Sequence, residues 1–262
     1  MGGWREKLFV DGSDPSLRIM NLRWPYTEKA VDGMLKVLAE RGVEGGTALD
    51  LCCGNGRISV YLAKRGFRSV GVDFSRPYIE DTRIKAVRYG VAGSVKFVEG
   101  DVRNLKEILG DCEAQFDVVV SAWTSIGYTT CDDDLSTFGQ ARELSREGSL
   151  MFIIETEHEG QATQRGSGSS LLELEDMVML EKTTYDPITA KKEAMWTFYR
   201  RRDRDLEHVD ELSYRVHVYS LPELSWLLGR AGWKVEACYG NIASRQAFSP
   251  HTGMNIVALA TP

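Results

Sequence analysis

Short apolar runs alternate with stretches of helical length between residues 47 and 155 of this chain. The apolar runs are Ala48–Leu51, Val70–Val72, Val95–Val98, Phe116–Val120 and Leu150–Ile154. The intervening stretches with apolar residues at helical spacing are Arg57–Arg65, Pro77–Tyr89 and Asp134–Arg146. Because strands that alternate with helices build βαβ units, the pattern predicts an α/β fold, a doubly wound and mostly parallel sheet with helices on both faces.

An N-terminal segment and an insertion lie on either side of this pattern. Thr27–Arg41 has apolar residues on one face and predicts an amphipathic helix within an N-terminal helical segment, residues 1–46. Gln161–Ser170 is rich in polar residues, glycine and serine, and predicts a mobile loop. It opens a predicted antiparallel β insertion, residues 161–218, whose strands are Met177–Tyr185, Glu193–Arg201 and Leu212–Tyr219.

The regular pattern returns after the insertion. Leu221–Ala231 predicts a helix, and Trp233–Tyr239 and Asn255–Ala260 predict strands. No linker is long enough to separate two independent domains. We therefore assign residues 47–160 and 219–262 to a single core that the insertion interrupts.

Composition narrows the class of protein. Of the 262 residues, 43% are hydrophobic and 27% are charged, which suits a folded chain with a sizeable core. The net charge of -6 argues against a surface built mainly to attract nucleic acid or anionic lipid. No apolar run is long enough to cross a bilayer, and the polar first residues do not resemble a secretory signal, so we expect a cytoplasmic protein.

The five cysteines are scattered along the chain and form no CxxC pair. Their odd number and their spacing indicate neither a disulfide framework nor a zinc site. No histidine, cysteine or carboxylate residues have the sequence spacing of metal ligands, so we expect no metal in the protein.

A loop with two glycines, Asp50–Gly56, leaves the first predicted strand and enters a helix. Glycine lets the backbone pass close to a ligand, and the free N–H groups of the helix can receive a carboxylate. Asp73 ends the second apolar run, where a carboxylate can accept both hydroxyls of a ribose. Ser59 stands where a dinucleotide fingerprint needs a third glycine, and Asp50 suits an ammonium group, so we expect a nucleoside-type ligand that is not NAD or flavin.

These residues together resemble the class I S-adenosylmethionine-dependent methyltransferases, which are seven-stranded and Rossmann-like. Asp50–Gly56 is similar to their first motif, with Cys52 where a glycine is usual. Glu99–Val102 resembles the segment in which an acid, here Asp101, meets the adenine amino group. Phe116–Ser121 looks like their fourth strand. The resemblance implies strand order 3-2-1-4-5-7-6 and a methyl donor, S-adenosylmethionine, that leaves as S-adenosylhomocysteine.

The resemblance also implies which residues contact the cofactor. They are Asp50, Cys52, Gly54, Asn55, Gly56, Asp73, Phe74, Asp101, Val102, Ser121 and Tyr26. Trp24 and Tyr26 precede the first predicted helix and could close over the cofactor, as N-terminal aromatic residues do in similar methyltransferases. Stapling of that helix by its aromatic residues is the alternative.

The acceptor is expected beyond the fourth strand, where Ser121–Tyr128 supplies aromatic rings and hydroxyls. This segment lacks the proline motifs of methyltransferases that act on nucleic-acid bases. In the insertion, Trp196 and Phe198 share one strand face. The expected substrate-binding residues are Trp123, Thr124, Tyr128, Trp196 and Phe198, and the candidates for a general base are His158 and Tyr128.

We predict in-line methyl transfer to an oxygen or nitrogen nucleophile of a small molecule. Two alternatives stay open. One is an RNA or protein acceptor, which the basic run Arg200–Arg204 would favour only if it lies beside the cofactor cleft. The other is a noncatalytic S-adenosylmethionine-binding module, which a collapsed space beyond Ser121 would indicate. The insertion either covers the cleft or pairs two subunits, so the expected assembly is a monomer or a homodimer without a membrane partner.

Overall fold

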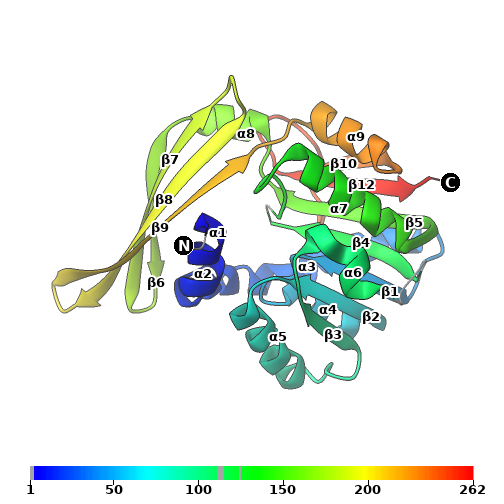
Figure 1. The fold of residues 1–262 in the computed structure, drawn as a ribbon, viewed down its shortest axis with the longest axis horizontal. Helices are drawn as coiled ribbons and strands as arrows, with labels where there is room; N and C mark the ends of the chain where they lie inside the picture. Colours follow the sequence, from blue (N-terminus) through cyan, green and yellow to red (C-terminus); the bar gives the residue numbers. More distant parts are fainter. Residues whose placement is uncertain (1–2, 111–114, 124, 262) are drawn as a thin grey trace.

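The computed structural model describes residues 3–110, 115–123 and 125–261, which form an α/β core and a smaller antiparallel sheet beside it (Figure 1). The N-terminal helices lie between these two parts. None of the helices in the described residues is long and apolar enough to span a bilayer.

The core sheet has eight strands within the described residues, in the order β11-β10-β12-β5-β4-β1-β2-β3. Their bounds are β1 Gly46–Leu51, β2 Phe67–Asp73, β3 Val95–Glu99, β4 Phe116–Ala122, β5 Ser145–Thr156, β10 Trp233–Asn241, β11 Gln246–Ala247 and β12 Met254–Ala260. Neighbours from β3 to β5 are parallel, and β12 is antiparallel to both β5 and β10. The predicted fold class and strand order are confirmed, and β11 adds a short strand at one edge.

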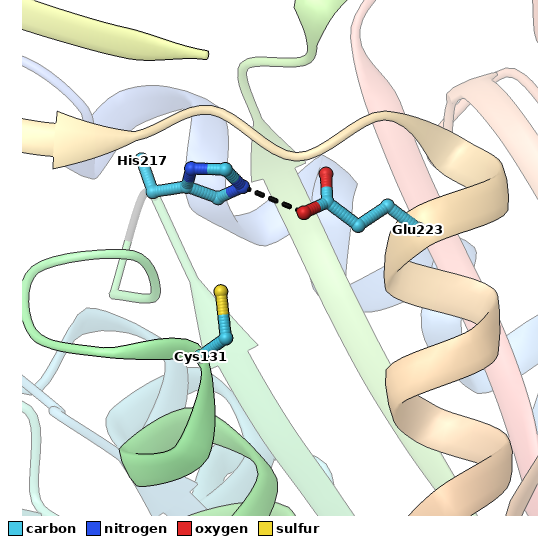
Figure 2. A group of neighbouring side chains, drawn as sticks. All are labelled: Cys131, His217 and Glu223. Carbon is cyan, nitrogen blue, oxygen red and sulfur yellow. Dashed lines mark hydrogen bonds and ion pairs between the residues drawn. The ribbon is translucent and has the colours of Figure 1, made fainter. Parts of the chain in front are cut away.

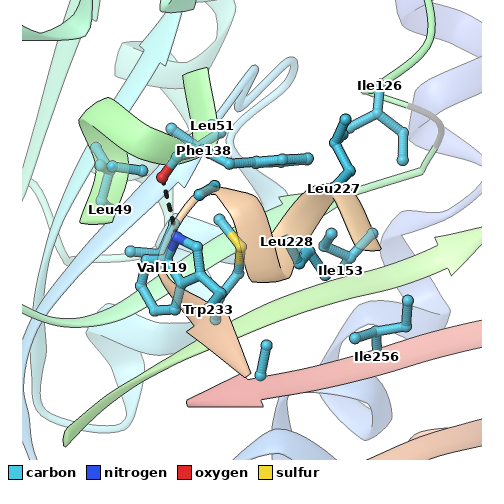
Figure 3. Packing of buried hydrophobic residues seen from close by; sticks show 14 of the residues in the cluster. Leu49, Leu51, Val119, Ile126, Phe138, Ile153, Leu227, Leu228, Trp233 and Ile256 are labelled. Atoms are coloured by element: carbon cyan, nitrogen blue, oxygen red, sulfur yellow. Dashed lines mark hydrogen bonds between the residues drawn. The ribbon is translucent and has the colours of Figure 1, made fainter. Parts of the chain in front are cut away.

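Helices cover both faces of this sheet because buried strands place successive side chains on opposite faces. Val119 of β4 joins a cluster with α6, α7 and α9, whereas its neighbours Val118 and Val120 join a cluster with α3 and α4. Figure 3 shows part of the first cluster, where buried Trp233 donates a 2.9 Å hydrogen bond from its indole nitrogen to the carbonyl of Phe138. The core helices are α3 Trp24–Ala39, α4 Arg57–Lys64, α5 Arg76–Arg88, the 3-10 turn η2 Val102–Asn104, α6 Leu105–Leu109, α7 Cys131–Glu143 and α9 Leu221–Arg230.

The predicted antiparallel insertion is a four-stranded sheet in the described residues, in the order β6-β7-β8-β9. Its strands are β6 Gly168–Leu174, β7 Met177–Asp186, β8 Lys191–Arg202 and β9 Asp205–His217. The expectation of a loop at Gln161–Ser170 is wrong. Residues 159–165 form the helix α8 (Glu159–Arg165), which His158 caps, and the glycine and serine residues that follow pair with β7, Ser170 lying opposite Glu181. Pairing along β7 outweighs their low strand propensity.

Three short helical elements precede the core and contact the insertion. They are α1 Trp4–Glu6, the π-type turn η1 Lys7–Asp11 and α2 Ser13–Asn21. Leu8 and Ile19 are buried in one cluster with Met177, Phe198 and Leu212 of the insertion sheet. This segment therefore joins the insertion to the core, and its position between them decides the shape of the site.

Candidate cofactor and acceptor site

Two cavities open at the carboxyl ends of the parallel strands. The larger, about 730 Å³, contacts the ends of β1, β2, β4 and β5, the N-terminal helices and the inner face of the insertion sheet. The smaller, about 60 Å³, lies between the ends of β1, β3 and β4. The chain order reverses between β1 and β4, and α/β sheets bind ligands at such a switch point. The space beyond Ser121 is therefore open, against the expectation for a noncatalytic module.

The loop after β1 adopts backbone angles that explain its glycines. Cys52, Gly54 and Gly56 have φ of 52°, 53° and 73°, in the left-handed region that glycine tolerates best. A Cβ on Gly56 would lie 2.7 Å from the Thr82 side chain, and one on Gly54 would lie 3.0 Å from the sulfur of Met20. Cys52 holds its angle at a cost of about 1–2 kcal/mol, because a side chain is disfavoured there.

Two buried carboxylates shape this loop, and both line the larger cavity. Asp73 accepts hydrogen bonds from the backbone N–H groups of Gly54 (2.8 Å) and Ser75 (2.9 Å). Asp50 accepts from the backbone N–H (3.1 Å) and the hydroxyl (2.7 Å) of Ser59. Burial raises the pKa of each carboxyl group to about 6. The serine that replaces the third glycine of a dinucleotide fingerprint therefore anchors Asp50.

The smaller cavity brings together the other predicted cofactor residues. Asp101, Val102, Ser121 and Phe74 all line it. Burial opposes ionisation of Asp101, but hydrogen bonds from the Arg103 side chain and backbone outweigh it and hold the pKa of Asp101 below its usual range. Asp101 thus caps the turn η2 and also faces the cavity.

The remaining cofactor residues differ in position. Asn55 is buried and donates a 3.1 Å hydrogen bond to the side-chain oxygen of Asn21. Tyr26 lines the larger cavity but is 69% exposed. Trp24 lines neither cavity and packs on Tyr89, with 5.2 Å between ring centroids, so its predicted closure over the cofactor is wrong. Packing against Tyr61 of α4 and Tyr89 after α5 accounts for this side chain.

The predicted acceptor residues separate into two groups. Trp123, Tyr128 and Trp196 line the larger cavity. Phe198 does not line it, because its side chain is fully buried against Leu8 and the other apolar residues between the insertion and the N-terminal helices. Its predicted contact with substrate is therefore wrong. Thr124 lies outside the described residues.

Neither candidate base is suited to that role. His158 is buried outside both cavities, where its Nδ1 accepts from the N–H of Gly160 (3.2 Å) and its Nε2 donates to the carbonyl of Thr252 (2.9 Å). Capping of α8 occupies Nδ1 and the bond to Thr252 occupies Nε2, so the prediction of a catalytic His158 is wrong. Burial raises the pKa of Tyr128 well above its ordinary value, which keeps its phenol protonated at neutral pH.

Three glutamates that the sequence analysis did not single out also line the larger cavity. Glu155, just before the end of β5, pairs with buried Arg57 at 2.7 Å. Glu157 pairs with Lys192 at 2.8 Å and with Arg165 at 2.9 Å. The position of Glu155 and Glu157 at the end of an apolar strand resembles that of Asp73 and could have identified these two.

Glu181 differs from the other two glutamates. One of its oxygens accepts from the indole N–H of Trp196 (2.9 Å) and the other from the hydroxyl of Ser170 (3.1 Å). No lysine or arginine in the described part of the chain forms an ion pair with it. A carboxylate has about four lone-pair sites, so Glu181 can accept further hydrogen bonds from a ligand.

Two other expectations from the sequence can now be compared with the structure. Arg200–Arg204 belongs to the exposed end of the β8–β9 hairpin, where its arginines pair with acidic neighbours such as Glu173 and Glu207. The run lines neither cavity, so it does not lie beside the cofactor cleft as an RNA or protein acceptor would require. Cys131, His217 and Glu223 come together in the fold, although their sequence spacing did not indicate metal ligands (Figure 2). Their sequence separation hid this cluster.

The strand order, the glycine loop and the acid at the end of β2 are the features of an α/β fold suited to a nucleoside-type ligand. Residues 48–148 match the family model described as a methyltransferase domain. This part of the chain is therefore similar to a methyltransferase domain, and the chain has the fold of the class I S-adenosylmethionine-dependent methyltransferases, as the resemblance implied.

Similar proteins extend this comparison. The YqeM protein of Bacillus subtilis, named as a methyltransferase, is 36% identical over 113 residues, which are 42% of this chain and 43% of YqeM. The chain thus spans less than half the length of the first curated relatives it matches. The CcbJ methyltransferase of Streptomyces caelestis has a TM-score of 0.76 at 24% identity, covering 91% of this chain and 90% of CcbJ. The sugar N-methyltransferase KedS8 of Streptoalloteichus has a TM-score of 0.68 at 14% identity, covering 88% and 87%.

Proposed function

We propose that this protein transfers the methyl group of S-adenosylmethionine to an amine nitrogen of a polar small molecule. Glu181 is the observation that supports an amine acceptor. Its carboxylate lines the larger cavity beside Trp196 and has no ion-pair partner in the described residues. Such a carboxylate suits a ligand group that carries N–H donors and positive charge. The cavity volume of about 730 Å³ is typical of small-molecule sites.

The residues at the strand ends fit the cofactor. Buried Asp73 faces the larger cavity and would accept hydrogen bonds from the ribose hydroxyls. Asp101, Val102 and Ser121 line the smaller cavity, which would hold the adenine. Asp50 would face the ammonium group of the methionine end. S-adenosylmethionine supplies an electrophilic methyl group on a sulfonium sulfur.

Charge movement favours an amine over a hydroxyl acceptor. An uncharged amine attacks with its lone pair, the carbon–sulfur bond breaks, and positive charge passes to the nitrogen. Glu181 can accept an N–H of the acceptor and stabilise that charge. A hydroxyl acceptor would instead need Glu181 as its base, because Tyr128 is protonated and Glu155 and Glu157 are already paired with cations.

The insertion sheet contributes to this proposal as a cover over the cavity. Met179, Trp196 and Tyr214 line the cavity from its inner face. Exclusion of water favours direct displacement between two bound reactants. KedS8, a sugar N-methyltransferase of similar fold, supports amine-bearing sugars as the first acceptors to test.

The test pairs each candidate amino sugar with the sugar that has a hydroxyl at the same carbon. We expect release of S-adenosylhomocysteine only with the amine, and mass spectrometry of the product should locate the methyl group on nitrogen. Methylation of the hydroxyl partner at an equal rate would contradict the proposal.

The variant Glu181→Gln tests the acceptor site without disturbing the fold or cofactor binding. It should lower kcat/KM roughly 10–100-fold, the equivalent of one charge-assisted hydrogen bond, and leave the Kd of S-adenosylmethionine unchanged. Glu193→Gln is the matched control, because Glu193 is exposed on the same sheet, pairs with Arg215 and lines neither cavity. Equal activity of the two variants would remove Glu181 from the acceptor site.

A further inference from the structure

Three side chains of different elements converge where the insertion rejoins the core (Figure 2). Cys131 is the first residue of α7, His217 is the last residue of β9, and Glu223 lies in the first turn of α9. One ligand atom from each, the thiol sulfur, an imidazole nitrogen and a carboxylate oxygen, lies within 4.8 Å of the other two. None of the three lines either cavity described above.

The backbone holds these elements together independently of the three side chains. The N–H of His217 donates to the carbonyl of Gly127 at 2.8 Å. A Cβ on Gly127 would clash with the carbonyl of His217, so the loop before α7 approaches β9 as closely as glycine allows. In addition, the Tyr219 hydroxyl donates to Asp134 of α7 at 2.6 Å. The ligand atoms therefore meet in a scaffold that is already fixed.

Both carboxylate oxygens of Glu223 make contacts in this cluster. Its Oε2 accepts from the N–H of Ser220 at 3.4 Å and completes the capping box of α9. Its Oε1 lies 2.8 Å from Nε2 of His217. In Figure 2 the sulfur of Cys131 points toward this pair. A thiol so placed makes only weak hydrogen bonds, whereas a thiolate is a strong ligand for a soft cation.

We infer that Cys131, His217 and Glu223 form a binding site for a zinc-like divalent cation, which ties the insertion to the core. Cysteine, histidine and glutamate are all established zinc ligands, at roughly 2.0–2.3 Å. Tetrahedral geometry at those lengths separates ligand atoms by roughly 3.3–3.6 Å. The three ligand atoms already lie within 4.8 Å of one another. Small side-chain rotations of half-exposed Glu223 and exposed Cys131 bring the atoms to these positions.

Binding displaces the thiol proton of Cys131, and His217 binds through Nε2 as the neutral imidazole whose proton is on Nδ1. The fourth position of the cation is left to water, because Cys131 is exposed. The cation links α7, β9 and α9, so its expected role is structural. It does not depend on the proposed methyl transfer.

The experiment adds cobalt(II) to the full chain after treatment with a chelator. Cobalt bound to a thiolate gives a charge-transfer absorption band, and zinc should abolish that band by displacing cobalt. Zinc should also raise the thermal midpoint of unfolding, because a cation that binds only the folded chain stabilises it. Absence of the band, or an unchanged midpoint with zinc, would overturn the inference.

Matched variants identify the ligands. Cys131→Ser should remove the thiolate band, and Cys238→Ser, on strand β10 outside the cluster, should retain it. Glu223→Gln preserves the capping box, because glutamine also accepts at that position, but should weaken zinc binding by at least about tenfold. A band that survives Cys131→Ser, or zinc affinity unchanged in Glu223→Gln, would assign the cation to other residues and refute the site.

Discussion

Replacing Asp50 by asparagine should stabilise the cofactor-free protein at neutral pH and weaken its binding of S-adenosylmethionine. The Asp50 side chain is buried and accepts two hydrogen bonds from Ser59, both through the same oxygen. Asparagine has nearly the same shape and retains one oxygen that can accept from Ser59. The substitution therefore removes the buried charge and preserves the local contacts.

The size of the effect follows from the pKa of Asp50. Burial raises this pKa from an ordinary 3.8 to about 6, so the folded chain binds the proton more tightly than the unfolded chain. The resulting stabilisation is fully present below pH 3.8 and is lost as the pH rises through about 6. One pKa unit is about 1.4 kcal/mol, so the parent loses up to about 3 kcal/mol that the Asp50→Asn variant does not lose.

Urea unfolding at a series of pH values, followed by tryptophan fluorescence, measures this difference directly. The free energy of unfolding of the variant, relative to the parent, should increase between about pH 4 and pH 7. Asp205→Asn, which removes an exposed carboxylate from the β8–β9 hairpin, is the control. Calorimetry should show at least about tenfold weaker cofactor binding by Asp50→Asn. A difference in unfolding free energy that stays constant with pH would refute the reasoning.

Three further substitutions test other parts of the site. Asp73→Ala should weaken S-adenosylmethionine binding by roughly 1–3 kcal/mol in calorimetry, because ribose hydroxyls lose their acceptor, and unchanged affinity in a folded variant would exclude that role. Gly56→Ala should destabilise the chain more than Gly90→Ala in urea unfolding, since both have positive φ but only the first new Cβ would press on Thr82; equal losses would contradict the steric argument. Phe198→Ala should lower the free energy of unfolding by about 3–5 kcal/mol through loss of a buried ring. A smaller decrease in this free energy together with weaker acceptor binding would show that Phe198 contacts the acceptor.

The parallel core could be predicted because local pattern and tertiary structure agree there. Val118, Val119 and Val120 are apolar without interruption, as a strand covered on both faces must be. Asp73 could be predicted for a related reason: the carboxyl end of such a strand opens onto the ligand side of the sheet. Both inferences need only the order of residues along one element.

The errors concern residues whose environment is made by distant parts of the chain. Ser170 lies in a strand because Glu181 of β7 pairs with it, which its own composition disfavours. His158 has the residue type of a base, but the carbonyl of Thr252, far along the chain, completes its role as a cap. The convergence of Cys131 with His217 likewise depends on where β9 returns to the core. The spacing of residues along the sequence does not predict these contacts between distant segments.

The packing of the first helices against the insertion has a consequence for synthesis of the chain on the ribosome. Leu8 and Ile19 find their buried partners on strands that extend to Leu212. The segment is synthesised before the insertion, so its apolar side chains cannot be covered until the insertion has been made. Until then these apolar side chains stay exposed to solvent, so completion of the fold waits for the insertion.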